Sequence, residues 1–413
     1  MVTLLATASF AADWPQYRGA NSDGASPETN ILKSWPQEGP RVVWKAPIGE
    51  SFGSFAVSQG KAFAFFERGG NEVCVALDAA TGKELWATAV DKTIFERQGG
   101  NGPRSTPTVD PGSGGGRVYV LGTYLKLACL NAADGNLLWK HDIQADFDGQ
   151  NGTSGINKWG SASSPVVEGD LVLVAGGGEG QSLLAFNKTT GALAWKKHSE
   201  KITHATPTPA TLHGVRQVIF FTQSGLVSVE PKTGDVLWRF AFPWQTSTAS
   251  SPIVYQDMVY CSAAYNVGAA TCKVEKTASG WKATQLWRTP SELMNHWTTP
   301  VCKDGYIYGI FGTARDGAAP LKCIEMATGK EMWSKPGFGG GGATTLVDGH
   351  VLVQGDKGPL VLVEATPKAY KEVARAQPLG GKCWTMAVVA NGRIFARNTK
   401  EGICLDVAGG GAQ

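Results

Sequence analysis

Short apolar segments separated by glycine-containing turns run along almost the whole chain, and the 3.6-residue period of helices is essentially absent. One pattern recurs: a short β-prone run ends in Asp, Asn or Glu, a turn with Gly follows, and the next run ends in Trp. An acidic or amide side chain can hydrogen-bond the turn backbone, and Gly permits positive φ, so each copy predicts a β-hairpin. The clearest copies are "ALDAATGKELW" (76–86), "CLNAADGNLLW" (129–139), "AFNKTTGALAW" (185–195), "SVEPKTGDVLW" (228–238) and "CIEMATGKEMW" (323–333).

The spacing of these hairpins gives the size of the repeating unit. The closing Trp residues, with two weaker copies included, are Trp44, Trp86, Trp139, Trp195, Trp238, Trp287 and Trp333, and they lie 42 to 56 residues apart. Each interval also contains two earlier strands, such as those within "SSPVVEGDLVLVAGG" (163–177). Four strands per unit at this period are typical of a β-propeller blade.

Counting the units predicts eight blades. Six lie between Trp44 and Trp333, a seventh at 343–375 has Val in place of Trp, and an eighth at 384–407 has only three strands. The segment "RVVWKA" (41–46) is a fourth strand without a blade of its own. We therefore expect the strand around Trp44 to pair with the C-terminal blade and close an all-β, eight-bladed ring, since closure leaves no free sheet edge.

The repeats resemble the pyrroloquinoline-quinone-like (PQQ-like) repeat, which quinoprotein dehydrogenases share with the outer-membrane assembly factor BamB. The opening "DWPQYRGANSDGASPETNILKSWP", together with "GPRSTPTV", "NHWTTPV" and "GKCWTMAV", is similar to exported bacterial propellers of this type. The resemblance covers nearly the whole chain and implies the fold. It says little about function, because the repeat residues serve the architecture.

The chain ends and the overall charge bear on location. The apolar run and small residues of "MVTLLATASFAADW" predict that residues 1–12 are the remnant of an export signal, which implies a periplasmic or extracellular protein. We expect one propeller over 13–407, with a lead-in at 13–40, and a flexible tail at 408–413. The net charge of +3 gives no reason to expect nucleic acid as a partner, and no later apolar run is long enough to span a membrane. We expect a monomer.

The repeat Trp residues and most of the eight cysteines are expected to be structural. A Trp on each outer strand has a large face to bury against the next blade. Cys129, Cys323 and Cys404 occupy a slot that other blades fill with Ala or Ser, as a small buried residue would. Cys261 and Cys272 flank a hairpin on adjacent strands, and a disulfide between them is left open.

The inner strands carry a ring of candidate binding residues. Aligning the blades on Pro107, Pro165, Pro207, Pro252 and Pro300, with Ala56, Thr344 and Ala387 in the other blades, sets a register. Three residues before that position, the blades read Gly53, Arg104, Ala162, His204, Ala249, Trp297, Gly341 and Trp384. Large residues in even blades and small ones in odd blades can share one channel mouth.

A cation, an imidazole and two indoles at one mouth predict a site for a polar, planar or sugar-like ligand. The predicted ligand-binding residues are Arg104, Trp159, His204, Asn295, His296, Trp297, Lys382, Cys383 and Trp384. The long loops at 87–103 and 140–160 should wall one side of the site. In the alternative, Arg104 pairs with Glu96 in the preceding loop and the indoles plug the channel against water.

No metal site is predicted. The loop "DFDGQNGTSGIN" (146–157) has Asn157 where a calcium loop needs a bidentate Glu. His204, His296 and Cys383 lack the spacing of a zinc motif.

Three functions remain open. We favour a non-catalytic propeller that binds a small ligand, a glycan or an envelope protein. In the second, a PQQ-dependent alcohol or sugar dehydrogenase, Trp297 or Trp384 would stack on the quinone, and Arg104 and Lys382 would neutralise its carboxylates. The resemblance then implies PQQ with calcium as cofactors, yet the adjacent cysteine pair and clustered acids of such enzymes are missing from the ring. The third is a polysaccharide lyase or hydrolase with His204 or His296 as the catalytic base.

Overall fold

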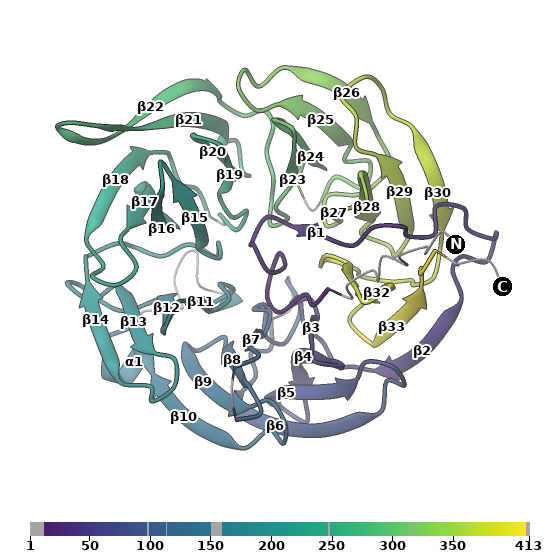
Figure 1. The fold of residues 1–413 in the computed structure, drawn as a ribbon, viewed down its shortest axis with the longest axis horizontal. Coiled ribbons are helices and arrows are strands. Elements are labelled where there is room, and N and C mark those ends of the chain that lie inside the picture. Colours follow the sequence, from purple (N-terminus) through teal and green to yellow (C-terminus); the bar gives the residue numbers. More distant parts are fainter. Residues whose placement is uncertain are drawn as a thin grey trace, which may run out of the picture.

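The strands form eight sheets arranged as a closed wheel (Figure 1). The coordinates are a computed structural model that describes residues 12–96, 99–112, 114–149, 159–246, 248–313 and 315–409. The predicted all-β, eight-bladed propeller is thereby confirmed. In the described part of the chain, no helix has the length and apolar character needed to cross a membrane.

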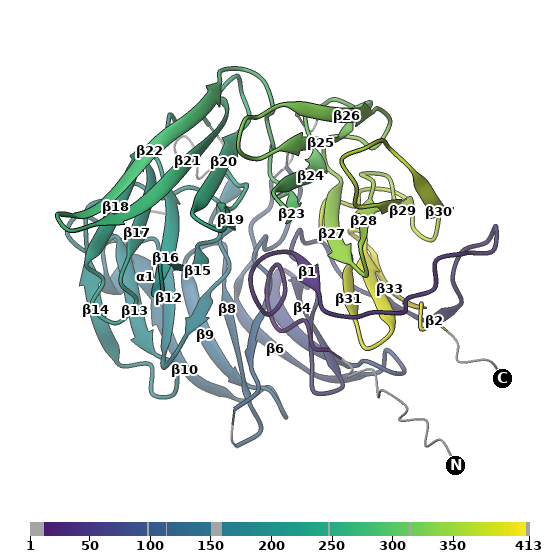
Figure 2. The same cartoon turned by 45° about the horizontal axis from the view of Figure 1, so that its top comes forward.

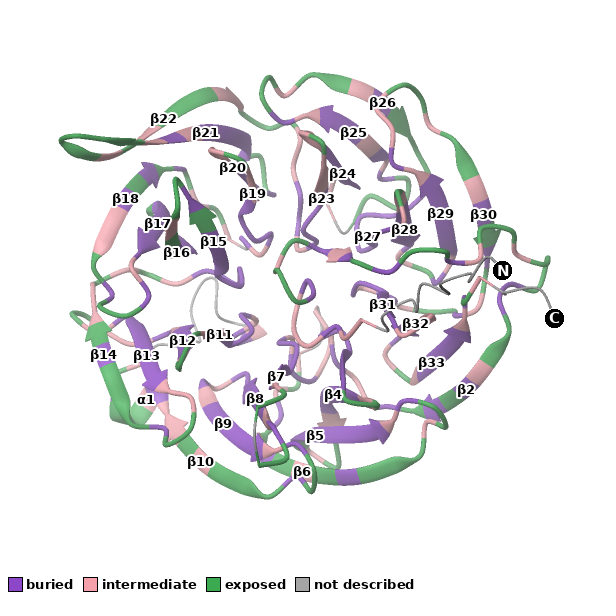
Figure 3. Cartoon of the chain, viewed as in Figure 1, coloured by how far each residue is buried: buried purple, intermediate pink, exposed green. Residues whose placement is uncertain are grey.

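Each blade is an antiparallel meander whose first strand lies innermost. Blade 1 consists of β3 (Ala56–Ser58), β4 (Lys61–Arg68), β5 (Asn71–Asp78) and β6 (Glu84–Lys92), and blade 2 of β7 (Thr108–Asp110), β8 (Arg117–Leu121), β9 (Lys126–Asn131) and β10 (Leu137–Asp142), followed by α1 (Ile143–Asp146). Blade 3 consists of β11 (Val166–Glu168), β12 (Leu171–Ala175), β13 (Leu183–Asn187) and β14 (Leu193–Lys197), and blade 4 of β15 (Thr208–Leu212), β16 (Val215–Thr222), β17 (Gly225–Val229) and β18 (Val236–Ala241). Blade 5 consists of β19 (Ile253–Tyr255), β20 (Met258–Ala263), β21 (Gly268–Thr277) and β22 (Gly280–Thr289), and blade 6 of β23 (Val301–Lys303), β24 (Tyr306–Ile310), β25 (Leu321–Glu325) and β26 (Glu331–Lys335). Blade 7 consists of β27 (Ala343–Val347), β28 (His350–Gln354), β29 (Leu360–Glu364) and β30 (Glu372–Ala376), and blade 8 contains β31 (Val388–Ala390), β32 (Arg393–Arg397) and β33 (Glu401–Asp406). The middle strands are almost wholly buried, whereas the outermost strands carry most of the exposed residues (Figure 3).

The N-terminal segment closes the wheel in two places. Strand β2 (Val42–Pro47) pairs antiparallel with β33 and places Trp44 opposite Cys404, which confirms the predicted closure. Strand β1 (Ala25–Ser26) adds a fifth strand to blade 7, because it pairs in parallel with β27. The sequence pattern does not predict this second pairing, since two residues are too few to show an alternation.

Before β1, the lead-in crosses the central opening of the wheel (Figures 1 and 2). The backbone of Trp14 pairs with β3 of blade 1, and the carbonyl of Pro15 accepts the first hydrogen bond from β7 of blade 2. On the far side, the buried Arg18 donates to the carbonyl of Thr299 in blade 6 at 3.1 Å. The lead-in therefore contacts opposite sides of the channel within a few residues.

The recurrence of Gly and Trp in the repeats is explained by contacts between neighbouring blades. The indole of one blade lies against the turn Gly of the next: a Cβ on Gly135 would come within 2.5 Å of the Trp86 ring. Each indole N–H also donates to a backbone carbonyl of that next blade. These donor–acceptor pairs are Trp44–Ala79 (3.0 Å), Trp86–Ala132 (3.2 Å), Trp139–Lys188 (3.3 Å), Trp195–Pro231 (2.8 Å), Trp287–Met326 (2.8 Å) and Trp333–Thr366 (2.8 Å).

Trp238 departs from this pattern because blade 5 differs. Strands β21 and β22 form a long hairpin that projects from the wheel, in place of the short Gly turn (Figure 1). The Trp238 indole instead donates to the side chain of Gln217 in its own blade at 2.6 Å. A buried N–H that loses one acceptor has thus gained another.

The cysteines that were expected to be small buried residues are buried. The disulfide between Cys261 and Cys272, which the sequence left undecided, does not form. Cys129, Cys323 and Cys404 are completely buried in blade cores. Cys261 lies opposite Ala270, and Cys272 lies opposite Val259, so the two thiols are not cross-strand partners. Both are free cysteines.

The ends of the chain bear on the predicted domain limits. Ala408 forms a β-bridge with Ile31, and the Gly409 N–H donates to the carbonyl of Asn30. The first two residues of the predicted flexible tail are therefore bonded to the lead-in. Residues 410–413 and almost all of the predicted signal remnant lie outside the described residues.

Candidate functional site

The structure corrects the sequence register in blade 1. In blade 2, the Thr106 N–H donates to Ser164 Oγ of the next blade, and Ser54 N–H donates to Thr106 Oγ1 in the same way, both at 2.9 Å. Ser54 is therefore equivalent to Thr106, and Phe52 is equivalent to Arg104. The predicted Gly53 was one residue off, so blades 1 and 2 both carry large residues and the alternation fails there.

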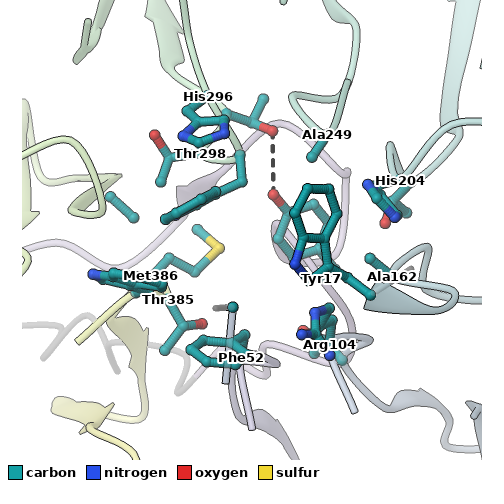
Figure 4. A pocket seen from close by; sticks show the side chains of 18 of the residues that line it. Tyr17, Phe52, Arg104, Ala162, His204, Ala249, His296, Thr298, Thr385 and Met386 are labelled. Atoms are coloured by element: carbon teal, nitrogen blue, oxygen red, sulfur yellow. Dashed lines mark hydrogen bonds between the residues drawn. The ribbon is translucent and has the colours of Figure 1, made fainter. Parts of the chain in front are cut away.

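The corrected ring surrounds one cavity of about 550 Å³ at the channel mouth. The ring residues that line it are Phe52, Arg104, Ala162, His204, Ala249, Trp297 and Trp384 (Figure 4). Blade 7 contributes Gly341, where a Cβ would lie 2.2 Å from the Trp384 ring. A small residue at that position leaves the room that the indole occupies, which is the physical basis of the large–small pairing.

Aromatic rings form a continuous arc along one side of the cavity. Successive ring centroids are 5.0 Å apart from Tyr265 to His296, 4.0 Å from His296 to Trp297, 4.6 Å from Trp297 to Trp384 and 5.7 Å from Trp384 to Phe52. These are favourable separations for aromatic pairs, so each ring helps to fix its neighbours. Neighbouring ring planes are inclined by 31° to 82°, so the arc is a preformed, stepped aromatic wall along the cavity.

Two cations flank the Phe52 end of this arc. The Arg104 guanidinium lies 5.4 Å from the Phe52 centroid, and the Lys382 ammonium lies 4.2 Å from that of Trp384. Arg104 donates to the carbonyls of Gly100 and Gly102, both at 2.9 Å. These two bonds use two of the five N–H donors of the guanidinium.

Burial shapes the ionisation of the Arg104 side chain. It lowers the pKa of Arg104 to about 10, and the charges of Glu96 and Glu72 partly oppose this effect. The guanidinium therefore stays charged at neutral pH in a poorly solvated position. Such a cation is a strong site for a carboxylate or phosphate.

The two candidate catalytic histidines, His204 and His296, are neutral at pH 7. Burial and the charge of Arg104 lower the pKa of His204 to about 4, and burial alone lowers that of His296 to about 4. His204 packs edge-on against Trp159, and His296 Nε2 lies 3.1 Å from the Tyr265 hydroxyl. Both rings are held in place by aromatic neighbours.

A second ring, of hydroxyl groups, lies two residues further along the inner strands. Four of these hydroxyl groups line the cavity, those of Thr106, Ser164, Thr206 and Thr299. Each hydroxyl oxygen accepts a hydrogen bond at 2.9 Å from a backbone N–H of the preceding blade, just before that blade's inner strand. A hydroxyl that accepts in this way can still donate its own proton. The lead-in adds Tyr17, whose hydroxyl lies 3.1 Å from that of Thr299 (Figure 4).

Three predicted binding residues do not line the cavity. Asn295 accepts from the Tyr260 hydroxyl and donates to the carbonyl of Ile310, so its amide braces blades 5 and 6. Cys383 is buried, and burial raises the pKa of its thiol to about 12, so the side chain is a neutral thiol at pH 7. Lys382 reaches the site only through its contacts with Trp384 and Phe52.

The sequence reasoning also missed residues that the cavity contains. Tyr17, Tyr265 and Arg315 come from the lead-in and from loops that carry no repeat signal. The hydroxyl ring did have a signal, because Ser or Thr precedes each marker proline. We did not recognise this signal, because a Ser or Thr that recurs in every strand is also consistent with ordinary β-strand composition.

The donor set of the cavity is cationic and aromatic. Among the described lining residues, none is Asp or Glu, and the described chain holds no cluster of three metal-ligating side chains. The loop considered for calcium falls largely on residues 150–158, outside the described residues. The lining that is described does not fit a calcium-bound quinone, because carboxylate oxygens are the expected calcium ligands.

Comparison with known proteins places the chain in a family. The family model described as outer membrane protein assembly factor BamB matches residues 69–309, more than half of the sequence. The chain belongs to this family. BamB of Burkholderia pseudomallei is 24% identical over 76% of this chain and 74% of its own length, and BamB of Yersinia pestis is 24% identical over 49% of this chain and 61% of its own length.

Solved structures agree on the fold of this BamB-family propeller. The crystal structure of BamB from Moraxella catarrhalis matches with a TM-score of 0.62 and 15% identity over 90% of this chain and 99% of its own. Quinohemoprotein alcohol dehydrogenase from Comamonas testosteroni matches with a TM-score of 0.67 and 14% identity over 99% and 82%. At such identities the likeness concerns the fold alone.

Proposed function

We propose that this BamB-family propeller is an exported, non-catalytic protein that binds a small anionic ligand with a flat face in the channel-mouth cavity. The observation that carries the proposal is the pairing of a buried, charged Arg104 with a preformed aromatic arc. The cavity volume also lies within the roughly 300–1,000 Å³ usual for small-molecule sites. The relatives named as assembly factors support a location in the cell envelope.

The charge distribution supports binding over acid–base catalysis. A general base works best with a pKa near the operating pH, and the pKa values of His204 and His296 near 4 make both weak bases at pH 7. The described lining provides no carboxylate as an alternative. The lyase or hydrolase is therefore less favoured than binding.

Intrinsic fluorescence tests the proposal directly, because Trp159, Trp297 and Trp384 lie at the cavity. Anionic ring compounds should quench the emission saturably, and Trp384→Phe should reduce the quenched fraction. Trp281→Phe is the matched control, since Trp281 lies in the β21–β22 hairpin, where it contacts Lys276 and, in the neighbouring blade 4, His213.

The same titration should include pyrroloquinoline quinone with and without calcium, followed by a dye-linked alcohol oxidation assay. Binding without turnover is the expected result if the quinone fits the cavity as an anion. Calcium-dependent turnover would favour the dehydrogenase. Absence of quenching by every anion would refute the ligand site and leave an envelope protein as the partner to seek.

A further inference from the structure

The cavity has two distinct layers and a floor. The ring of Arg104 and the indoles lies at the mouth, and the hydroxyl ring lies two residues deeper, which is roughly 6–7 Å along a β-strand. Below the hydroxyls, the lead-in spans the channel, and Tyr17 lies at the cavity (Figure 4). A ligand that enters from the mouth thus meets charge and aromatic rings first and hydroxyl groups last.

The floor is firmly attached on both sides. The Trp14 backbone bonds to Val57 in both directions, at 2.8 and 2.7 Å. On the other side of the channel, Arg18 donates to the carbonyl of Thr299 in blade 6, and the Leu346 N–H donates to the carbonyl of Gly24 at 2.8 Å. An extended polymer cannot thread through a channel that a buried, hydrogen-bonded segment crosses.

We propose that the cavity receives the terminal residue of an acidic glycan, inserted end-on from the channel mouth. This inference rests on the proposed ligand site and adds its chemical class. The sugar carboxylate pairs with Arg104, the sugar ring packs against the aromatic wall that includes Trp297 and Trp384, and the sugar hydroxyls reach Ser164 and Thr206.

Two features favour a carboxylated sugar over an aromatic carboxylate. An aromatic acid needs only a flat surface and a cation, and it would leave the hydroxyls of Ser164 and Thr206 facing an apolar edge. A hexuronic acid presents several hydroxyl groups and so matches that ring. The neutral His204 and His296 rings, which already contact the Gly160 backbone and the Tyr265 hydroxyl, add polar but uncharged groups to the lining.

Calorimetric titration of the full chain tests the sugar class. The probes are hexuronic acids (galacturonate, glucuronate, mannuronate and guluronate), their oligomers, the matching neutral sugars and benzoate. We expect one of the acid series to bind at least tenfold more tightly than its neutral parent. Arg104→Gln should remove that preference, a loss of about 10- to 150-fold for a hydrogen-bonded charge. Arg216→Gln is the control, because Arg216 pairs with Glu168 at the end of β11 opposite to the cavity, and neither residue lines the cavity.

Chain length tests the end-on geometry. Polyuronate and short oligomers are compared at the same total concentration of sugar residues. If only chain ends bind, the long polymer has far fewer ends at that concentration and should bind much more weakly than its short oligomers. Binding in proportion to total sugar would overturn end-on insertion. Tight binding of benzoate with no uronate binding would overturn the glycan and keep the anion site, whereas failure of every anion would remove the proposed function as well.

Should Arg104→Gln fold poorly, Trp384→Phe gives an independent readout. It keeps the charge and narrows the stacking surface, so the acid preference should persist while the affinity for acid and neutral sugar falls together. Loss of the acid preference in Trp384→Phe would contradict the assignment of the carboxylate to Arg104.

Discussion

The variant Arg104→Gln tests whether Arg104 contributes mainly to ligand affinity or mainly to the stability of the fold. Burial lowers the pKa of Arg104 to about 10, roughly two and a half pKa units below the usual value, and each unit is worth about 1.36 kcal/mol. Because the pKa is lower in the folded than in the unfolded state, and pH 7 lies below both values, the folded protein bears the whole penalty at neutral pH. That penalty is about 3 kcal/mol.

The hydrogen bonds of Arg104 offset most of this penalty. The two bonds to Gly100 and Gly102 contribute about 1.5 kcal/mol each, the lower end of the range for a charged donor. Arg104→Gln should therefore change the free energy of unfolding by no more than about 1 kcal/mol, while the affinity for an anion falls at least tenfold. A charge that adds little to stability and much to affinity is typical of a functional site.

Guanidinium denaturation and ligand titration of the same variant provide the assay. Arg18→Gln serves as the structural comparison, since Arg18 is buried, donates to two carbonyls within the lead-in and anchors the lead-in to blade 6 through the carbonyl of Thr299. We expect Arg18→Gln to be clearly destabilised and Arg104→Gln to melt like the wild type. If Arg104→Gln loses more than about 2 kcal/mol of stability, the arginine belongs to the fold, and the alternative of an ion pair with Glu96 is favoured.

Three further predictions follow from the structure. Gly135→Ala should destabilise the protein by about 1–3 kcal/mol more than Gly60→Ala in denaturant unfolding, because both glycines have positive φ but only Gly135 abuts an indole; equal losses would show that the inter-blade contact adds nothing. Glu72→Gln should raise stability at pH 8 by up to about 3 kcal/mol and leave it nearly unchanged at pH 4.5, since burial raises the pKa of Glu72 from 4.5 to about 7 and the cost of its charge appears as the pH rises through that range; a benefit confined to low pH would contradict this sign. Anion affinity should stay constant from pH 8 to pH 5, because the pKa values of His204 and His296 are near 4; a rise centred on pH 6.5 in the fluorescence titration would show that one of them is solvated.

Much of the architecture follows from the sequence because blade formation is a local property. The Asp/Asn-to-Gly turns, the strand alternation and the Trp spacing each depend on residues close together in the chain. Even the closure by β2 could be predicted, since blade 8 visibly lacked one strand and Trp44 matched the missing position. Cys129 and Cys404 were likewise identifiable as small buried residues from their shared slot.

The site itself was predictable only in part. Arg104, His204, Trp297 and Trp384 meet at one mouth, as their register indicated. The register failed in blade 1, where no proline marks the strand start and Ala56 is one residue past the true position. A shift of one residue replaces Gly53 by Phe52 and changes the ring from alternating to asymmetric.

Tertiary structure alone decided the depth of the cavity and its floor. The two-residue β1, the crossing lead-in and Tyr17 carry no periodic signal, because their partners lie in blades hundreds of residues away. Likewise, the neutral histidines and the lowered pKa of Arg104 arise from burial by several blades at once. Sequence determined the wheel because each blade is built from neighbours in the chain, whereas the pocket depended on how eight separate strand starts and one N-terminal segment converge on a common axis.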